Sequence, residues 1–361
     1  MLNNVSREPT RLRERTPLRD RIPLEDELTR LLEANVPSAR DCRLVRRVLG
    51  WDGQRGCCLK HAGEESGITR ERARQIYDHA IARICTAELT STLDEALALV
   101  NRRSNRAAAD IEAELHLRGF TRYPFAIRAL LKTAEAFGRV PAFTVEETSG
   151  KLFVVAAPGL VLSIIKAALK SSATGGVQNA SALCSAIPER HRRRHDRLFI
   201  RQVLNTRGDI RWLDAAEETF WLASVPWNPM LRCLKKVICY ASPVALVDLH
   251  RAISRLPARH RPTLSLQLLT KFCEQAPFCR VANGCVELVT PLAETDLTSH
   301  AERIVCGILA RNGNELSIQN LQSLCVSAGV MKPNFSRIVL HSPLIVRRAP
   351  GIYSVITARS S

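Results

Sequence analysis

The feature that most constrains the fold is a repeat in the larger, C-terminal part of the chain. Short β-like runs recur there at an almost constant distance, and each ends in a pair of residues of which at least one is aromatic or apolar. The distance from the first residue of one pair to the first residue of the next is 67, 67 and 66 residues. These first residues are Phe153, Phe220, Glu287 and Tyr353. Because a period this steady indicates one supersecondary unit copied in tandem, we expect four similar small units instead of one large core.

Each copy contains three helical segments followed by two β-like runs joined by a polar turn. In the third copy Asn283-Gly284, the strongest two-residue signal for a hairpin, separates the two runs. In the fourth, Pro350-Gly351 takes the same place. Predicted helices span 92–102, 107–118 and 125–137 in the first copy, 161–170, 179–186 and 196–205 in the second, 232–240, 244–256 and 264–274 in the third, and 301–311, 317–328 and 332–341 in the fourth.

Three helices closed by a hairpin are typical of a winged helix, so the chain is predicted to be mainly α with short β-hairpin wings. Ahead of the repeats, the Arg- and Pro-rich start lacks any period and is expected to be flexible. The predicted organisation is a flexible basic arm (1–22), a helix-turn-helix domain (23–90), and a tandem array of four winged-helix-like units, the first to fourth repeats, at 91–159, 160–226, 227–292 and 293–361.

Residues 39–84 carry the pattern of the helix-turn-helix. Gly50 and Gly53 permit the positive φ of a tight turn after a first amphipathic helix. Gly67 suits the left-handed position just past a second, short helix, and Thr69 then offers its hydroxyl as the N-cap of a third.

The first two turns of this third helix hold side chains that can read DNA. Arginine can bind guanine edges, glutamine can bind adenine, and glutamate can accept a hydrogen bond from cytosine. A solvated surface helix on a small bundle would contain the same residue types, and this alternative stays open. The polar residues are Arg70, Glu71, Arg72, Arg74 and Gln75, and the apolar stripe beneath them is Ala73, Ile76, Ala80 and Ile84.

The same segment resembles region 4 of the bacterial primary-type sigma factors, which reads the promoter −35 element. The resemblance implies base contacts by Arg70, Glu71 and Gln75, and backbone contacts by Arg72, Arg74 and the N-cap residue Thr69. It covers about an eighth of the chain. It rests on the ordered set Arg40-Asp41, Gly50-Trp51-Asp52-Gly53, Leu59, Ala62-Gly63, the run 67–76 and Ala80, with no gap inside it.

Two departures from the family pattern stand out. Cys57-Cys58 replaces the usual polar residue and Thr before the second helix, and Ser66 stands where the family usually has a large apolar residue. Sigma factors that open promoters also carry an aromatic, basic region. Here aromatic residues make up 5% of the chain and form no such cluster before Ala39, so a complete sigma factor is not expected.

The formal net charge of +17 favours a polyanionic partner. Residues 1–90 hold 17 Lys/Arg against 14 Asp/Glu, whereas residues 91–361 hold 35 against 21, so most of the excess lies in the repeats. The densest basic run, at 189–201, places Arg192, Arg193 and Arg194 before a helix, where they are expected to contact the DNA backbone. A solvated charge cluster is the alternative.

No cofactor, metal or catalytic site is expected. The motifs of phosphate-binding loops, serine hydrolases and zinc proteases are missing, and the cysteine spacings suit no standard zinc site. The start Met-Leu-Asn-Asn-Val-Ser-Arg lacks an apolar signal, so the 12 cysteines are expected to be cytoplasmic thiols, with Cys85, Cys306 and Cys325 as small core residues. Pro158-Gly159 interrupts the longest apolar stretch, which argues against a membrane span.

These observations predict a double-stranded DNA-binding protein that is not an enzyme and acts as a sequence-specific transcription regulator. The resemblance adds the RNA polymerase core as a second partner, because region 4 also docks there, and another large protein is the alternative. The alternative is a non-enzymatic, DNA-anchoring scaffold subunit of a larger DNA-handling or defence complex. The length of the chain and the lack of a recognisable sensor domain favour that alternative.

Overall fold

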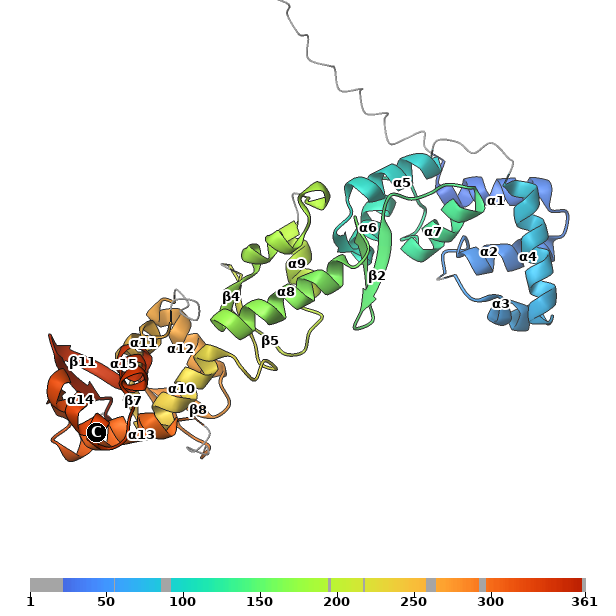
Figure 1. The fold of residues 1–361 in the computed structure, drawn as a ribbon. Coiled ribbons are helices and arrows are strands. Elements are labelled where there is room, and N and C mark those ends of the chain that lie inside the picture. Colours follow the sequence, from blue (N-terminus) through green and yellow to red (C-terminus); the bar gives the residue numbers. More distant parts are fainter. Residues whose placement is uncertain are drawn as a thin grey trace, which may run out of the picture. The chain divides into compact units, whose positions relative to one another are not determined.

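The computed structural model describes residues 22–54, 56–85, 92–193, 196–216, 218–257, 264–291 and 297–358. The chain divides into two compact bodies, an N-terminal body of Met1–Pro158 and a C-terminal body of Gly159–Ser361. Figure 1 shows the elements along the chain. The predicted basic arm at 1–22 lies outside the described residues except for its last residue, Ile22.

The N-terminal body contains the helix-turn-helix segment and the first repeat. Four helices come first: α1 (Leu24–Asn35), α2 (Ala39–Leu49), α3 (Leu59–Glu65) and α4 (Arg70–Ile84). The first repeat follows with α5 (Thr92–Arg102), β1 (Arg106–Ala107), α6 (Ala108–Leu117), α7 (Ile127–Ala136), β2 (Thr144–Thr148) and β3 (Lys151–Val155).

The C-terminal body contains the other three repeats. The second has α8 (Leu160–Gly175), β4 (Val177–Asn179), the 3-10 helices η1 (Ala180–Ala186) and η2 (Glu189–His191), α9 (Asp196–Leu204), β5 (Ile210–Asp214) and β6 (Thr219–Leu222). The third has α10 (Pro229–Tyr240), β7 (Val244–Ala245), α11 (Leu246–Ser254), α12 (Leu266–Gln275), β8 (Cys279–Ala282) and β9 (Cys285–Leu288). The fourth has α13 (His300–Arg311), β10 (Glu315–Ser317), α14 (Ile318–Ser327), α15 (Lys332–His341), β11 (Ile345–Ala349) and β12 (Ile352–Val355).

Each of the four repeats forms its own three-stranded antiparallel sheet, and the four sheets have the same strand order. The strand orders are β1-β3-β2, β4-β6-β5, β7-β9-β8 and β10-β12-β11, so the last strand of each repeat always lies in the middle. The prediction of a mainly helical chain with four hairpins is therefore confirmed. The first strand of each sheet was not predicted, because two or three residues are too few to show an alternating pattern.

Most predicted helices are confirmed to within a few residues at their ends, although the one predicted at 161–170 extends to Gly175, and two further differences have clear local causes. The segment predicted as a helix at 179–186 forms the 3-10 helix η1, in which Asn179 Oδ1 accepts hydrogen bonds from the Ser181 amide (2.8 Å) and hydroxyl (2.5 Å). Such local bonds compete with α-helical geometry. The helix predicted to begin at Val244 begins at Leu246, because Val244 and Ala245 pair with β9.

One apolar core joins the helix-turn-helix segment to the first repeat. It runs from Leu24 in α1 through Trp51 to Leu130 in α7 and Val154 in β3. Trp51 is buried, and its Nε1 donates a hydrogen bond to Thr133 Oγ1 at 2.8 Å. The helix-turn-helix segment therefore depends on the first repeat for part of its core.

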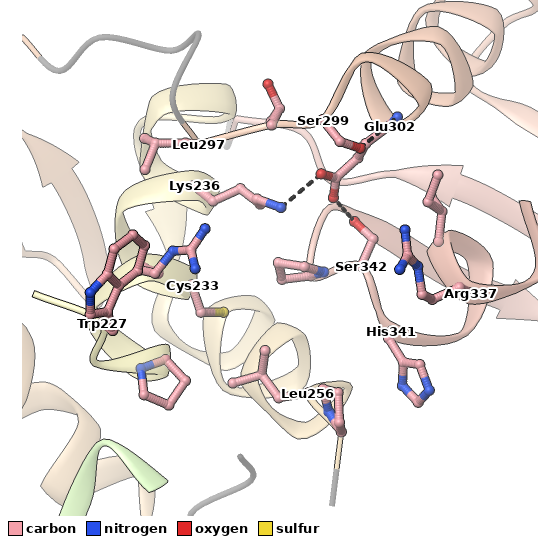
Figure 2. A pocket seen from close by; sticks show the side chains of 16 residues that line it. Trp227, Cys233, Lys236, Leu256, Leu297, Ser299, Glu302, Arg337, His341 and Ser342 are labelled. Carbon is pink, nitrogen blue, oxygen red and sulfur yellow. Dashed lines mark hydrogen bonds and ion pairs between the residues drawn. The ribbon is translucent and has the colours of Figure 1, made fainter. Parts of the chain in front are cut away.

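The third and fourth repeats are joined by a partly buried ion pair. Lys236 Nζ of α10 lies 2.7 Å from Glu302 Oε2 of α13, and the Ser342 hydroxyl donates to Glu302 Oε1 at 2.5 Å (Figure 2). Arg255, at the end of α11, donates to the carbonyls of Val339 and Ser342 at the end of α15. These bonds fix the two repeats against each other.

Within the described segments, no helix is both long enough and apolar enough to cross a bilayer.

Candidate nucleic-acid interface

The predicted first turn has the expected backbone geometry. Helix α2 begins after Ser38, whose hydroxyl accepts from the Asp41 amide at 3.2 Å, and it ends at Gly50, whose φ is +75°. A Cβ on Gly50 would lie 2.9 Å from the Gly56 nitrogen, so a glycine is required there by both φ and space. Gly53 also has a positive φ, +81°.

Two arginines of α2 hold the short helix α3 in place. Arg47 forms a two-pronged ion pair with Glu65, with N to O distances of 2.9 and 3.1 Å. Arg40 donates to the Ser66 carbonyl at 2.6 Å, where a positive charge also suits the C-terminal end of a helix. The pair with Arg47 lowers the pKa of the Glu65 carboxyl. Sequence reasoning included Arg40 in the matched pattern but assigned no role to either arginine.

Helices α3 and α4 approach closely at a glycine. A Cβ on Gly63 would lie 3.0 Å from the Ile68 carbonyl oxygen and 3.4 Å from the Ala73 Cβ. Gly67, just past α3, has a φ of +65°, as predicted for the left-handed position. The small residues at this crossing let α4 lie directly against α3.

Helix α4 presents its predicted polar face to solvent. The Thr69 hydroxyl accepts from the Arg72 amide at 3.2 Å, which confirms the predicted N-cap. Of the predicted apolar stripe, Ala73, Ala80 and Ile84 are buried and Ile76 is half-buried. The exposed side chains are Thr69, Arg70, Glu71, Arg72, Arg74 and Gln75.

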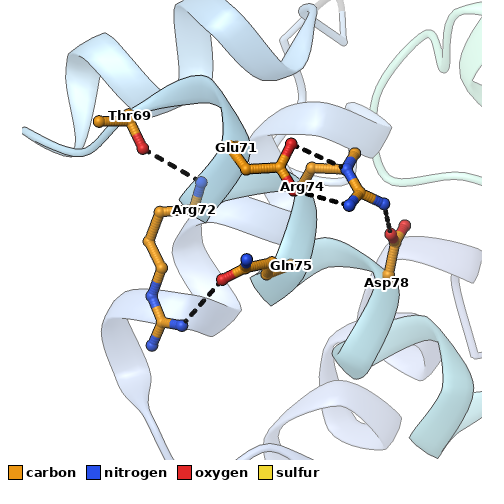
Figure 3. A network of polar contacts seen from close by, with 6 residues as sticks. All are labelled: Thr69, Glu71, Arg72, Arg74, Gln75 and Asp78. Atoms are coloured by element: carbon orange, nitrogen blue, oxygen red, sulfur yellow. Dashed lines mark hydrogen bonds and ion pairs between the residues drawn. The ribbon is translucent and has the colours of Figure 1, made fainter.

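Several of these polar side chains pair with one another (Figure 3). Arg74 bonds both Glu71 oxygens, at 2.6 and 3.1 Å, and also Asp78 at 2.8 Å. The bond from Arg74 lowers the pKa of the Glu71 carboxyl. Arg72 donates to Gln75 Oε1 at 3.2 Å. Sequence reasoning missed Asp78, although its place four residues after Arg74 is the spacing of a helical ion pair.

Arg70 differs from its neighbours in this network. In the described part of the chain its guanidinium has no hydrogen-bond or ion-pair partner, and it lies in the first turn of α4. The face therefore combines one unpaired arginine with two pairs, Arg72–Gln75 and Arg74–Glu71, whose groups are exposed to water. Exposed pairs of this kind exchange partners readily, because water screens them.

The predicted backbone-contacting arginines of the second repeat lie in the other body. Arg192 Nε donates to the Ile187 carbonyl at 3.1 Å, and the Arg193 amide donates to Asp196 Oδ2 at 2.7 Å. Arg194 lies outside the described residues. The loop between η2 and α9 is thus tied to its own repeat through Arg192 and Arg193.

The cysteines differ in part from expectation. Cys306 and Cys325 are buried, as predicted, whereas Cys85 is exposed because it follows the last turn of α4 on its solvent side. Burial raises the pKa of the Cys325 thiol to about 11. No group of three or more His, Cys, Asp or Glu side chains in the described segments is arranged to hold a metal ion.

The chain was compared with known proteins by sequence. No protein-family model matches it, and no curated protein matches it.

Proposed function

We propose that the chain is a double-stranded DNA-binding protein that reads base sequence with α4 and regulates transcription at promoters. The observation that carries the proposal is the exposed row of DNA-reading side chains on α4, which lies opposite a buried apolar stripe and begins at the Thr69 cap. A helix anchored in this way can enter the major groove with its first turns, as recognition helices do.

In this proposal, α4 divides its contacts between bases and backbone. Arg70, Glu71 and Gln75 bind base edges, whereas Thr69, Arg72 and Arg74 bind phosphates. Binding opens the pairs seen in the free chain. Arg74 then turns from Glu71 to a phosphate, and Glu71 becomes free to accept a hydrogen bond from a cytosine amino group.

We further propose that the four repeats are winged helices. The order of elements supports this proposal, because each repeat has a helix, a short strand, two helices and a hairpin. The short strand pairs with the last strand of the hairpin. In the second repeat two short 3-10 helices take the place of the middle helix. Units of this kind contact DNA or protein through the helix before the hairpin and through the wing. Arg192, Arg193 and Arg194 are the proposed backbone contacts of the second repeat, and a cytoplasmic RNA polymerase core is the proposed protein partner.

Selection of bound sites from random duplex DNA, at two salt concentrations, tests the proposal. We expect the full chain to recover a sequence motif, and Arg70→Ala with Gln75→Ala to lose it. The matched control is Arg139→Ala, another exposed arginine of the N-terminal body, far along the chain from α4. The control should keep the motif.

Two outcomes would contradict this reading of α4. A motif that survives the double substitution would show that other residues read the bases. Binding without any motif, but with strong salt dependence, would favour the DNA-anchoring scaffold subunit, because phosphate contacts alone carry no sequence information.

A further inference from the structure

A hollow of about 680 Å³ lies in the C-terminal body between the third and fourth repeats (Figure 2). Side chains of α10 and of the segment after α11 form one wall, and those of α13 and α15 form the other. Its volume falls within the range of small-molecule sites, roughly 300–1,000 Å³. Nothing in the DNA-reading role of α4 requires this hollow.

Among the residues that the structure describes, positive charge exceeds negative charge around the hollow. Arg232 of α10 and Arg337 of α15 both line it, are exposed, and have no ion-pair partner in the described part of the chain. Arg337 donates a long hydrogen bond, 3.4 Å, to Asn334 Oδ1. Among the described residues that line the hollow, Glu302 is the one carboxylate, and Lys236 neutralises it. An anionic ligand is therefore favoured.

An aromatic ring stands at the edge of the hollow. Trp227 is 69% exposed, whereas Trp51 and Trp221 are buried and Trp212 is half-buried. The Arg232 guanidinium lies over the Trp227 ring, 5.5 Å from its centroid. An indole left in water can stack against a planar base, and a neighbouring guanidinium strengthens such sites.

The remaining walls combine apolar side chains with polar ones, among them Thr298, Ser299 and His341. Leu256, Pro229 and Pro343 line the hollow, and Cys233 lies buried at its base. Burial raises the pKa of the Cys233 thiol to about 12, so this group stays neutral. The ion pair of Lys236 with Glu302 fixes the distance between the walls, which keeps the site formed before any ligand arrives.

We infer that this hollow binds a nucleotide, with its base stacked on Trp227 and its phosphates held by Arg232 and Arg337. The ligand is either a free nucleotide or one nucleotide of a single-stranded nucleic acid, since both present the same base and phosphate. This inference does not rest on the proposed function of α4, because all of its residues lie in the C-terminal body.

Tryptophan fluorescence of the full chain provides the test. ATP, inorganic triphosphate and a short oligothymidylate are titrated separately, and quenching by acrylamide reports how exposed Trp227 is. We expect ATP or the oligonucleotide to quench the emission and to protect Trp227 from acrylamide, with triphosphate binding more weakly. Tighter binding of ATP identifies a free nucleotide as the ligand, and tighter binding of the oligonucleotide identifies a single strand.

Substitutions distinguish a specific nucleotide site from non-specific attraction of the anionic ligand to a basic surface. Calorimetry should show that Arg337→Ala weakens binding roughly tenfold or more, as expected for a lost charge-assisted contact. Trp227→Leu should weaken it too and remove the fluorescence response. Arg311→Ala is the matched control, because Arg311 is exposed in the same repeat but does not line the hollow.

Three results would overturn the inference: no change in Trp227 emission with either nucleotide ligand, equal weakening by Arg337→Ala and Arg311→Ala, or triphosphate binding as tightly as ATP. Duplex binding through α4 is measured on the same variants. Because the substituted residues lie outside the N-terminal body, a lost nucleotide site with intact duplex binding separates this inference from the proposed function.

Discussion

Asp78 lies 2.8 Å from Arg74, one turn further along α4, and shares that guanidinium with Glu71. The charge of Arg74 is therefore balanced by two carboxylates in the free chain. This arrangement holds in place an arginine that we propose contacts the DNA backbone, and it reduces the attraction of that arginine for phosphate.

Asp78→Asn should strengthen binding to all duplex sequences about equally. The substitution removes a negative charge beside the proposed backbone contact, so the slope of log affinity against log salt should steepen by up to about 1. Fluorescence anisotropy with two unrelated duplexes measures this. Asp94→Asn, which removes an exposed carboxylate paired with Arg139 in the same body, should leave the slope unchanged.

Cys58→Thr should stabilise the helix-turn-helix segment. Cys58 is the N-cap of α3, is exposed, and makes no side-chain cap bond, whereas a threonine hydroxyl can accept from the free amides of the first turn. The expected gain is about 0.5–1 kcal/mol in the free energy of unfolding. Urea denaturation measures it. Cys85→Thr, at the other exposed cysteine near α4, should change little, and equal effects at both sites would contradict the capping argument.

Thr133→Val should destabilise the N-terminal body by about 1–3 kcal/mol. Valine keeps the shape of threonine but leaves the buried Trp51 N–H, now bonded at 2.8 Å, without an acceptor. Urea denaturation followed by circular dichroism measures the loss, because this signal remains when Trp51 is replaced. In a double-mutant cycle with Trp51→Phe, the two changes should be coupled by about 1 kcal/mol, and strict additivity would show that the bond contributes nothing.

Glu302→Gln should destabilise the junction of the third and fourth repeats by about 3 kcal/mol. It leaves the Lys236 ammonium, whose side chain is 20% exposed, without its partner. Urea denaturation should show most of this loss recovered in the double variant Lys236→Met with Glu302→Leu. As a comparison, Asp248→Asn removes one partner of the exposed pair with Arg251 and should have little effect.

Local signals in the sequence predicted local structure well. Gly50, Gly67 and Thr69 were assigned to a turn, a helix end and a cap, because each residue type has a backbone geometry or hydrogen bond that few others provide. Asn283-Gly284 marked its hairpin for the same reason, with φ values of +50° and +72°. The exposed face of α4 followed from the spacing of Ala73, Ala80 and Ile84, which are buried.

Contacts between residues far apart in the sequence could not be predicted from such local signals. The bond between Trp51 and Thr133 joins residues 82 apart in sequence, and the pair of Lys236 with Glu302 joins residues 66 apart. Neither residue type nor spacing identifies partners over such distances. The pairing of Arg72 with Gln75 was also missed, since the sequence shows which side chains lie on one face but not which rotamers bring them together.

Each sheet in this chain is completed by strands from a single repeat, from β1-β3-β2 to β10-β12-β11. A gene that gained or lost one whole repeat would therefore leave every remaining sheet with all of its strands. For a repeat after the first, which shares its core with α1 to α4, the contacts that would need to adapt are those between neighbouring repeats, such as Trp221 against Phe272 with ring centroids 5.0 Å apart. A chain of this architecture can thus change in length by whole repeats after the first, while the helix-turn-helix segment keeps the core that it shares with the first repeat.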